Sequence, residues 1–313
     1  MKKIILAALA ALVFAACNVN YDKTPSGLVY KVFQGKGGDS LKPGNIVKYR
    51  VEFILADRKD KKDSTLNPEV KVPNYIQVDT GKRYEYSFIE IMPKLRAGDS
   101  TVVVLSVDSL KKRNQVEYNE TFVKGSSIKC NLKILQTFKD QKDAIADYQK
   151  EIEIENKRET KSVEDYMAQK SIKGVKTKSG AYVAVENPGD QTMKADSGKV
   201  ATIKYKGYLQ SNGKVFDTNY DTSKGHAEPI AVTVGQHGII PAWGEALPYF
   251  GKGGSGKILV PAFLGYGAQG SPPDIAPYSN IVFDIQVLDV KTAPPAEKNN
   301  NQNQMQAPQK RGN

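Results

Sequence analysis

The sequence predicts an α+β protein built from two copies of one mostly β domain, each with one short helix, joined by a charged helical linker. Short segments recur in the same order about 155 residues later, with a spacing that drifts only between 153 and 156, as expected for a duplicated structural unit. These segments alternate apolar and polar residues, which is typical of half-buried antiparallel strands. Residues 139–173 between the copies are rich in charges of both signs with sparse apolar positions, which favours a helix.

The beginning of the chain has the features of an export signal. Lys2 and Lys3 precede an apolar run from Ile4 to Ala16, which is too short to span a bilayer. The segment Phe14-Ala15-Ala16-Cys17 resembles a bacterial lipobox, with phenylalanine in place of the usual leucine. We therefore expect a lipoprotein signal peptide over 1–16, lipidation of Cys17 and a tether over 17–26. A plain secretory signal with a coincidental cysteine is the alternative.

Lipid on Cys17 would make the membrane a partner of the protein. Several acyl chains anchor a protein stably, whereas one chain gives marginal binding. The residue after Cys17 is Asn18 and not the aspartate that retains many lipoproteins at the inner membrane. The expected location is therefore the bacterial cell envelope, on the periplasmic side of the outer membrane.

The first copy of the domain is expected over 27–137. Strand patterns cover 28–33, 47–53, 101–105 and 128–135. Cys130 falls on the apolar face of the last of these, so we expect it to be a small buried side chain. If Cys17 carries lipid, Cys130 is the one cysteine left, and no disulfide within the chain is available.

The linker is expected over 138–173, and a disordered tail rich in Pro, Asn and Gln over 292–313. Residues 155–162 have no apolar face, which favours a solvated spacer. A dimerising helix is the alternative, so a homodimer is also open.

The net charge of +11 does not by itself indicate a nucleic-acid partner. The lysines are scattered among acidic residues, without a basic stripe interleaved with aromatic residues or an RNA-binding motif. We therefore expect no nucleic acid. A basic surface that binds an anionic polymer is the weakest of the alternatives.

The single tryptophan of the chain lies in the segment GQHGIIPAWGEALPYF. Trp243 is expected to open a short helix in which Ala246, Leu247 and Phe250 share one face. A tryptophan in this place is either an ordinary core residue or the floor of a pocket.

The second copy, residues 174–291, contains five blocks that are informative together. They are Ile203 to Leu209, Gly213 to Asp217, Ile239 to Leu247, Val260-Pro261 with Gly265-Tyr266-Gly267, and Ile281 to Ile285. In these blocks and their order the second copy resembles the FKBP-type peptidyl-prolyl cis-trans isomerases. The segment from Glu155 through Tyr166 to Lys176 also resembles the helix before this domain in exported isomerases of the macrophage infectivity potentiator group.

The resemblance implies a curled antiparallel sheet around one short helix, with a pocket between them. It assigns catalytic positions to Tyr205, Phe216, Asp217, Ile240, Trp243, Tyr266 and Phe283, and further pocket positions to Ile230, Val232 and Ile239. Two residues depart from the family pattern: Ile230 stands where an aromatic residue is common, and Ala242 replaces a glycine. No cofactor and no metal are implied, and His226 and His237, the only histidines, form no ligand set.

The function that the resemblance implies is isomerisation of prolyl peptide bonds in unfolded or exported polypeptides. Such bonds isomerise slowly enough to limit folding. A noncatalytic interaction or chaperone module in an envelope assembly is the alternative.

The first copy lacks most of these site residues. Tyr49 is matched with Tyr205 and Phe88 with Trp243, but Lys61 falls near the position of Asp217 and Cys130 near that of Phe283. No Gly-Tyr-Gly follows Ser106. We predict an inactive domain of the same fold that serves as a spacer, a dimerisation element or a surface that holds client proteins.

Overall fold

A computed structural model describes residues 20–292, except 39, 58, 60–61, 67–70, 80, 82–83 and 237–239. The predicted signal peptide, Cys17, Lys61 and the tail beyond Thr292 lie outside the described residues. The chain divides into two compact units, with the boundary between Glu155 and Asn156. Within the described part, no helix is both long enough and apolar enough to cross a membrane.

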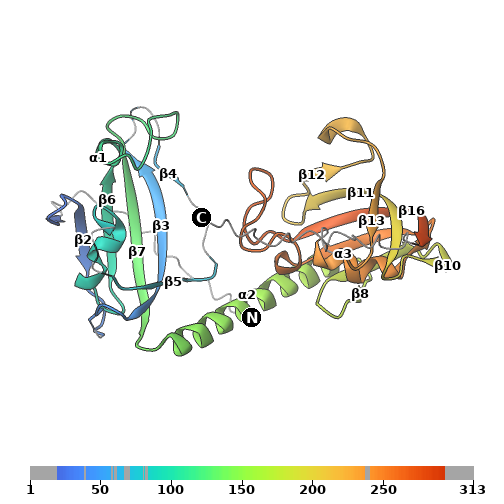
Figure 1. Cartoon of the computed structure of the whole chain (residues 1–313), viewed down its shortest axis with the longest axis horizontal. Helices are drawn as coiled ribbons and strands as arrows, with labels where there is room; N and C mark the ends of the chain where they lie inside the picture. The colour runs from blue at the N-terminus through green and yellow to red at the C-terminus, as the bar shows by residue number, and fades with distance from the viewer. Residues whose placement is uncertain are drawn as a thin grey trace, which may run out of the picture. The chain divides into compact units, whose positions relative to one another are not determined.

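Unit 1, the residues up to Glu155, is an antiparallel sheet with the strand order β1-β2-β6-β7-β3-β4, and β5 also pairs with β3 (Figure 1). The short helix η2 buries Ile91 and Met92 in the core. The elements are β1 (Asp22–Lys23), β2 (Val29–Phe33), β3 (Ile46–Ala56), β4 (Ser64–Thr65), β5 (Asn74–Gln77), η2 (Phe88–Lys94), β6 (Ser100–Ser106), α1 (Val107–Lys112) and β7 (Ser127–Phe138).

Unit 2 repeats this topology with the strand order β8-β9-β15-β16-β11-β12, and β13 also pairs with β11. The short helix α3 and the turn η4 take the place of η2. The elements are β8 (Val175–Lys176), β9 (Tyr182–Asn187), β10 (Asp190–Lys194), β11 (Lys199–Leu209), β12 (Val215–Thr218), η3 (Thr222–Lys224), β13 (Ile230–Thr233), α3 (Pro241–Ala246), η4 (Leu247–Tyr249), β14 (Gly251–Lys252), β15 (Ser255–Val260), η5 (Ala262–Leu264) and β16 (Ile281–Thr292). The predicted fold class, two copies of one α+β domain, is confirmed.

The repeated sequence segments meet in each unit through a serine–glutamate hydrogen bond. In unit 1 the Ser26 hydroxyl donates to Glu90 at 2.6 Å, and in unit 2 the Ser179 hydroxyl donates to Glu245 at 2.7 Å. The glycine after each serine has positive φ, 88° at Gly27 and 114° at Gly180, a conformation that glycine adopts without strain. The two sequence repeats therefore encode one tertiary contact that ties the N-terminal turn of each unit to its short helix.

The structure changes how residues of the two units correspond. A bulge in β3 places Tyr49 opposite Ile134 and Asn74, and the bulge in β11 places Ile203 opposite Val287 and Ile230. Both strands carry the bulge at the same place, so Tyr49 corresponds to Ile203. The match of Tyr49 with Tyr205 was wrong, because this correspondence is fixed by pairing between strands, which the sequence does not show. Val51 occupies the position of Tyr205 instead.

The register agrees with the match between Cys130 and Phe283. Phe53 pairs with Cys130 across β3 and β7, and Gly207 pairs with Phe283 across β11 and β16. Cys130 is fully buried, as expected, and burial raises the pKa of its thiol to about 12. This thiol is therefore protonated and inert at neutral pH.

The helix α2 (Gln141–Gln169) falls within the predicted helical linker. Its interpretation as a solvated spacer was wrong, because Glu155 and Glu159 are each only 3% exposed. Val163 and Met167, four residues apart, pack against the outer face of the unit 2 sheet, where they meet a layer made by Tyr182, Ala184, Leu259 and Val282. Two apolar positions and buried carboxylates attach this helix, although it has no broad apolar face.

Candidate active site

Unit 2 contains a cavity of about 470 Å³ between the sheet and α3. Strands β11, β12, β13 and β16, the start of α3 and the segment after η5 all contribute to its wall. The lining residues are Tyr205, Asp217, Ile230, Ile240, Pro241, Trp243, Gly265, Tyr266 and Phe283. Seven of the ten residues assigned to the site from the sequence are among them.

Aromatic rings meet edge to face around Trp243. The Trp243 and Phe283 ring centroids lie 5.1 Å apart at 84°, and those of Trp243 and Tyr205 lie 5.5 Å apart at 77°, an arrangement that aromatic pairs prefer. Trp243 is 4% exposed and belongs to the core of unit 2 while it also lines the cavity. Within the part of the chain that the structure describes, its indole N–H has no hydrogen-bond partner, a situation that calls for an explanation in a buried polar group.

Of the remaining three assigned residues, two are described by the structure and do not line the cavity. Phe216 supports the wall from behind, with its ring centroid 5.7 Å from Phe283 and 6.2 Å from Tyr266. Val232 is buried in the core. Ile239 lies outside the described residues.

Gly207 makes room for this arrangement. A Cβ atom at Gly207 would lie 2.6 Å from the Phe216 ring and 2.8 Å from the Phe283 ring. Contacts this short require the rings to move. A residue without a side chain on β11 is therefore what allows both rings to stand behind the cavity.

The polar groups of the site centre on Asp217. The Tyr205 hydroxyl donates to one carboxylate oxygen of Asp217 at 2.5 Å, and Nε2 of His226 lies 3.0 Å from the other. Burial, and then the hydrogen bond to Asp217, raises the pKa of Tyr205 above its usual value. Burial, and then the negative charge of Asp217, also raises the pKa of Tyr266. Both phenols are therefore protonated at neutral pH and able to donate hydrogen bonds.

The two departures from the family pattern are accommodated. Ile230 lines the cavity from β13. Ala242 lies within α3 and is fully buried. Because a helical backbone has negative φ, glycine is not required at this position.

Sequence reasoning missed Pro241, Gly265 and His226. Pro241 and Gly265 stood inside the quoted blocks, next to assigned residues, so their neighbours were a signal that was available. His226 stood alone in a loop and carried no signal, because its contact with Asp217 depends on the path of the chain between β12 and β13.

The linker helix α2 reaches the wall of the cavity indirectly. The buried carboxylate of Glu159 accepts a hydrogen bond from the backbone N–H of Phe263 at 2.8 Å. The Glu159 carbonyl accepts one from the side chain of Asn280, which in turn accepts from the N–H of Ala262 at 2.9 Å. These bonds fix the η5 turn immediately before Gly265 and Tyr266.

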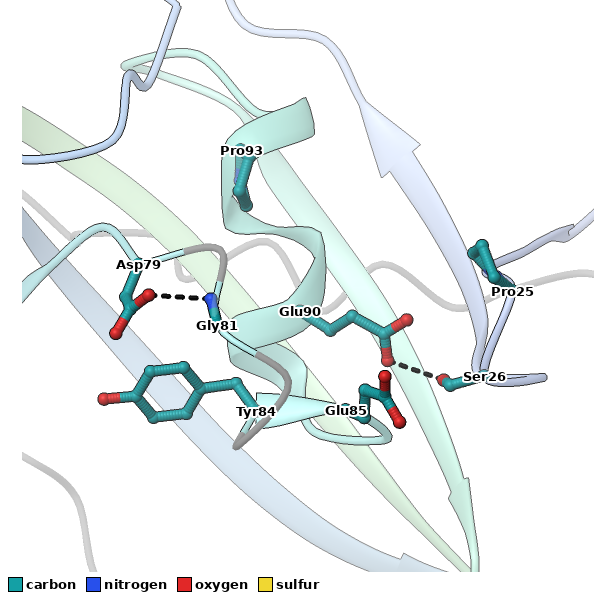
Figure 2. Close-up of a pocket in the computed structure, with 8 residues that line it drawn as sticks. All are labelled: Pro25, Ser26, Asp79, Gly81, Tyr84, Glu85, Glu90 and Pro93. Carbon is teal, nitrogen blue, oxygen red and sulfur yellow. Dashed lines mark hydrogen bonds between the residues drawn. The ribbon is translucent and has the colours of Figure 1, made fainter.

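Unit 1 has a different arrangement at the corresponding place. The ring of Phe88 contacts Phe53 at 5.7 Å and Tyr49 at 6.0 Å between centroids. Figure 2 shows a separate polar pocket of about 330 Å³ beside the Ser26–Glu90 hydrogen bond. It is lined by Pro25, Ser26, Asp79, Gly81, Tyr84, Glu85, Glu90 and Pro93, and it shares no residue with the Phe88 cluster.

Among the described residues, no three His, Cys, Asp or Glu side chains form a group that could hold a metal ion.

The arrangement in unit 2 is an apolar, aromatic cavity with a few polar groups at its wall, which is typical of sites that bind a small apolar group.

Comparison with known proteins points to one family. The model of the FKBP-type peptidyl-prolyl cis-trans isomerase domain matches residues 191–288. The FKBP-type peptidyl-prolyl cis-trans isomerase FkpA of Escherichia coli is 41% identical over 126 residues, which are 40% of this chain and 43% of that protein. The chain thus matches less than half the length of this relative.

Shorter relatives are covered more completely. An FK506-binding protein of Neisseria meningitidis is 33% identical over 96 residues, 31% of this chain and 84% of that protein. The peptidyl-prolyl cis-trans isomerase FPR2 of Saccharomyces cerevisiae is 36% identical over 104 residues, 33% of this chain and 74% of that protein. The crystal structure of Escherichia coli FkpA aligns with a TM-score of 0.36 and 29% identity, over 49% of this chain and 70% of that one. With the matched region centred on the cavity of unit 2, the chain belongs to the FKBP-type peptidyl-prolyl cis-trans isomerase family.

Proposed function

We propose that unit 2 catalyses cis-trans isomerisation of prolyl peptide bonds, and that the cavity around Trp243 binds the proline ring. The observation that carries the proposal is the aromatic cavity itself, in which Tyr205, Trp243 and Phe283 enclose an apolar space beside Asp217. The three rings offer apolar surface to a proline side chain, and the Tyr266 hydroxyl offers a donor to the flanking peptide, since the Tyr205 hydroxyl already donates to Asp217.

Such a cavity needs no nucleophile to accelerate the reaction. Rotation about a peptide bond faces a barrier of about 18–20 kcal/mol because it breaks amide resonance. The twisted transition state has a less polar carbonyl than the planar amide, so a water-poor apolar wall favours the transition state. Stabilisation of that state by about 6 kcal/mol would accelerate the reaction by about four to five orders of magnitude.

Isomerisation of a proline-containing tetrapeptide by the full chain, followed by NMR exchange spectroscopy, tests the proposal. We expect a rate well above the uncatalysed one, and roughly tenfold less for Phe283→Leu, which keeps the bulk of the side chain but removes the ring. Cys130→Ala, at the corresponding position of unit 1, is the matched control and should retain the full rate. A folded chain with no rate enhancement would refute the proposal.

We also propose that unit 1 is noncatalytic and binds or spaces client polypeptides. The Phe53 and Phe88 rings meet edge to face at the corresponding place in unit 1, which supports this assignment. If replacement of Asp217 together with Phe283 abolished catalysis but left the cellular phenotype intact, the alternative of a purely noncatalytic interaction module would be favoured for the whole chain.

The proposed location is the bacterial envelope, with Cys17 lipidated and exported polypeptides as clients. The proposal is supported by the basic and apolar start of the chain and by the lipobox-like segment that ends at Cys17. Metabolic labelling with an alkynyl fatty acid should label the wild-type chain and not Cys17→Ser. Equal labelling of both would overturn lipidation at this residue.

A second copy of the chain is a further proposed partner. Ile145 and Tyr148, three residues apart on α2, are 52% and 41% exposed, and an exposed apolar pair on a helix supports self-association. Sedimentation equilibrium should show a dimer that Ile145→Glu weakens. A wild-type monomer at all concentrations would contradict this proposal.

A further inference from the structure

His226 contacts the site from outside the cavity. Its Nε2 atom lies 3.0 Å from Asp217 Oδ1, while Tyr205 donates to Asp217 Oδ2 at 2.5 Å. Asp217 and Tyr205 line the cavity and His226 does not. The carboxylate at the cavity wall is therefore held between a phenol inside the site and an imidazole behind it.

The loop between β12 and β13 fixes His226 in this place. Asp221 caps the turn η3 by accepting a hydrogen bond from the N–H of Ser223, and Gly225 ends the turn in the left-handed conformation, with φ of 86°. At the other end of the loop, the fully buried side chain of Asn219 donates to the carbonyl oxygens of Ile203 and Glu228, at 3.1 Å in each case. Both flanks of His226 are thus tied to the sheet or to their own turn.

Solvent reaches the pair. The His226 and Asp217 side chains are 40% and 37% exposed, so the imidazole can exchange its proton with water. Histidine is the side chain whose charge ordinarily changes between about pH 5 and 8. With a neutral imidazole the pair of His226 and Asp217 carries one negative charge, and with an imidazolium it carries no net charge.

Other titratable and charged groups belong to the neighbouring elements and to the same loop. Asp217 comes from β12, Tyr205 from β11 and Tyr266 from the segment after η5, while Lys224 and Glu228 lie on the same loop as His226. Among the described residues, Asp217 is the one carboxylate that forms an ion pair with His226. Protonation of this imidazole therefore changes the charge directly beside Asp217.

We propose that His226 determines which charge the site prefers on the residue next to proline: the pair with Asp217 favours a cationic over an acidic neighbour when the imidazole is neutral, and loses this preference when it is protonated. His226 is a positioning and specificity residue that acts through Asp217. The inference rests on the proposed isomerase function, because it concerns substrates of the same cavity.

Three tetrapeptides that differ only in the residue before proline, with Lys, Leu or Glu at that place, test the inference on the full chain. kcat/KM is measured for each between pH 5.5 and 8. We expect the Lys-to-Glu ratio to rise roughly fivefold over this range, the size expected for one charge a few ångströms away in a partly solvated site. The ratio cancels any effect of pH on the amount of folded protein, and the Leu peptide reports the uncharged reference.

Two substitutions fix the pair in either state. His226→Gln keeps a donor but stays neutral, so the ratio should remain at its high-pH value throughout. His226→Arg stays charged, so the ratio should remain at its low-pH value. Lys224→Gln, a charge change on the same loop, is the matched control and should leave the fivefold rise intact.

The outcomes separate this inference from the proposed function. Catalysis with the same ratio at pH 5.5 and 8, or a rise that persists in His226→Gln, would overturn the role of His226 while the isomerase function stands. Absence of catalysis with all three peptides at every pH would instead refute the proposed function itself.

Discussion

The two units have the same sheet topology and differ at one cross-strand pair, which in unit 2 lies beside the cavity. In unit 1, Phe53 on β3 faces Cys130 on β7, whereas in unit 2, Gly207 on β11 faces Phe283 on β16. Each pair joins one large side chain and one small one, but the ring has moved to the other strand. In unit 1 the ring lies 5.7 Å from Phe88, and in unit 2 it stands at the cavity wall beside Trp243.

This difference shows that the same fold can place the ring of this pair on either of two neighbouring strands. Interiors are close-packed, so a missing ring has to be replaced by another group of similar volume. In unit 1 the ring of Phe53 supplies that volume, and the small side chain of Cys130 leaves room for it. The serine–glutamate hydrogen bond, which stabilises the fold but touches no cavity residue, is present in both units.

Transfer of the unit 1 pair into unit 2 should have the largest effect. Gly207→Phe combined with Phe283→Cys should lower kcat/KM for a proline peptide by roughly 100-fold or more, because the ring would leave the wall of the cavity. The double variant should fold better than Gly207→Phe alone, whose Cβ would lie 2.6 Å from the Phe216 ring and whose overpacking should cost about 1–3 kcal/mol of unfolding free energy.

Peptide kinetics and urea denaturation of the same samples check this expectation. Trp243, the single tryptophan, reports the unfolding of unit 2. Cys130→Ala is the control for a small change at the corresponding position. Full activity in the double variant would show that the position of the ring does not distinguish the two units.

The second difference between the units is how each contacts the helix α2. In unit 1 the buried Lys48 pairs with Asp147 and Glu151 of the helix, whereas in unit 2 the helix packs on the outer face of the sheet and bonds the η5 turn through Glu159. Glu159→Ala should lower the unfolding free energy of unit 2 by roughly 2 kcal/mol, because the Phe263 N–H loses a charged acceptor. It should also lower kcat/KM, since η5 precedes Tyr266. Glu159→Gln, whose amide oxygen still accepts a hydrogen bond, should restore most of both.

Tryptophan fluorescence in urea and peptide kinetics again provide the measurement. Lys161→Gln, on the same helix with a 72% exposed side chain paired to Asp165, is the matched control and should change stability by less than about 0.5 kcal/mol. If Glu159→Ala behaved like this control, the helix would be an attachment without influence on the cavity.

The sequence was sufficient for the duplicated fold and for most of the cavity, because both depend on local patterns. Period-two alternation located the strands, and the family resemblance assigned seven of the nine cavity residues to the site. Three features were not accessible in this way. The correspondence of Tyr49 with Ile203 depends on pairing between strands, and the approach of His226 to Asp217 depends on the path of a loop.

The burial of Glu155 and Glu159 was the third. A helix segment without apolar residues is usually solvated. Here a backbone N–H of a distant turn supplies the partner that makes a buried carboxylate tolerable at Glu159. Glu159 and Phe263 are 104 positions apart in the chain, so no local sequence pattern predicts this hydrogen bond.

The smallest expected effect concerns the contact that the two units share, and it is a test of their equivalence. Burial alone would raise the pKa of Glu90, but hydrogen bonds from Ser26 and from the N–H of Tyr86 outweigh it and lower the pKa. The pKa of Glu245 is lowered by the backbone N–H and then the hydroxyl of Ser179. A carboxylate with a lowered pKa in the folded state stabilises the protein above its unfolded pKa of about 4.3, and this stabilisation is lost as the pH falls through the folded value.

Glu90→Gln and Glu245→Gln should therefore each lower the unfolding free energy at pH 7 by about 1 kcal/mol, in unit 1 and unit 2 respectively. The difference from wild type should shrink as the pH falls below about 4. Circular dichroism in urea follows both units, and Trp243 fluorescence isolates unit 2. Glu117→Gln, whose side chain is 74% exposed beside Lys111, is the matched control and should show neither the loss nor its pH dependence. If only one of Glu90→Gln and Glu245→Gln lowered stability, the serine–glutamate hydrogen bond would have different roles in the two units. The cross-strand pair would then no longer be the main distinction between them.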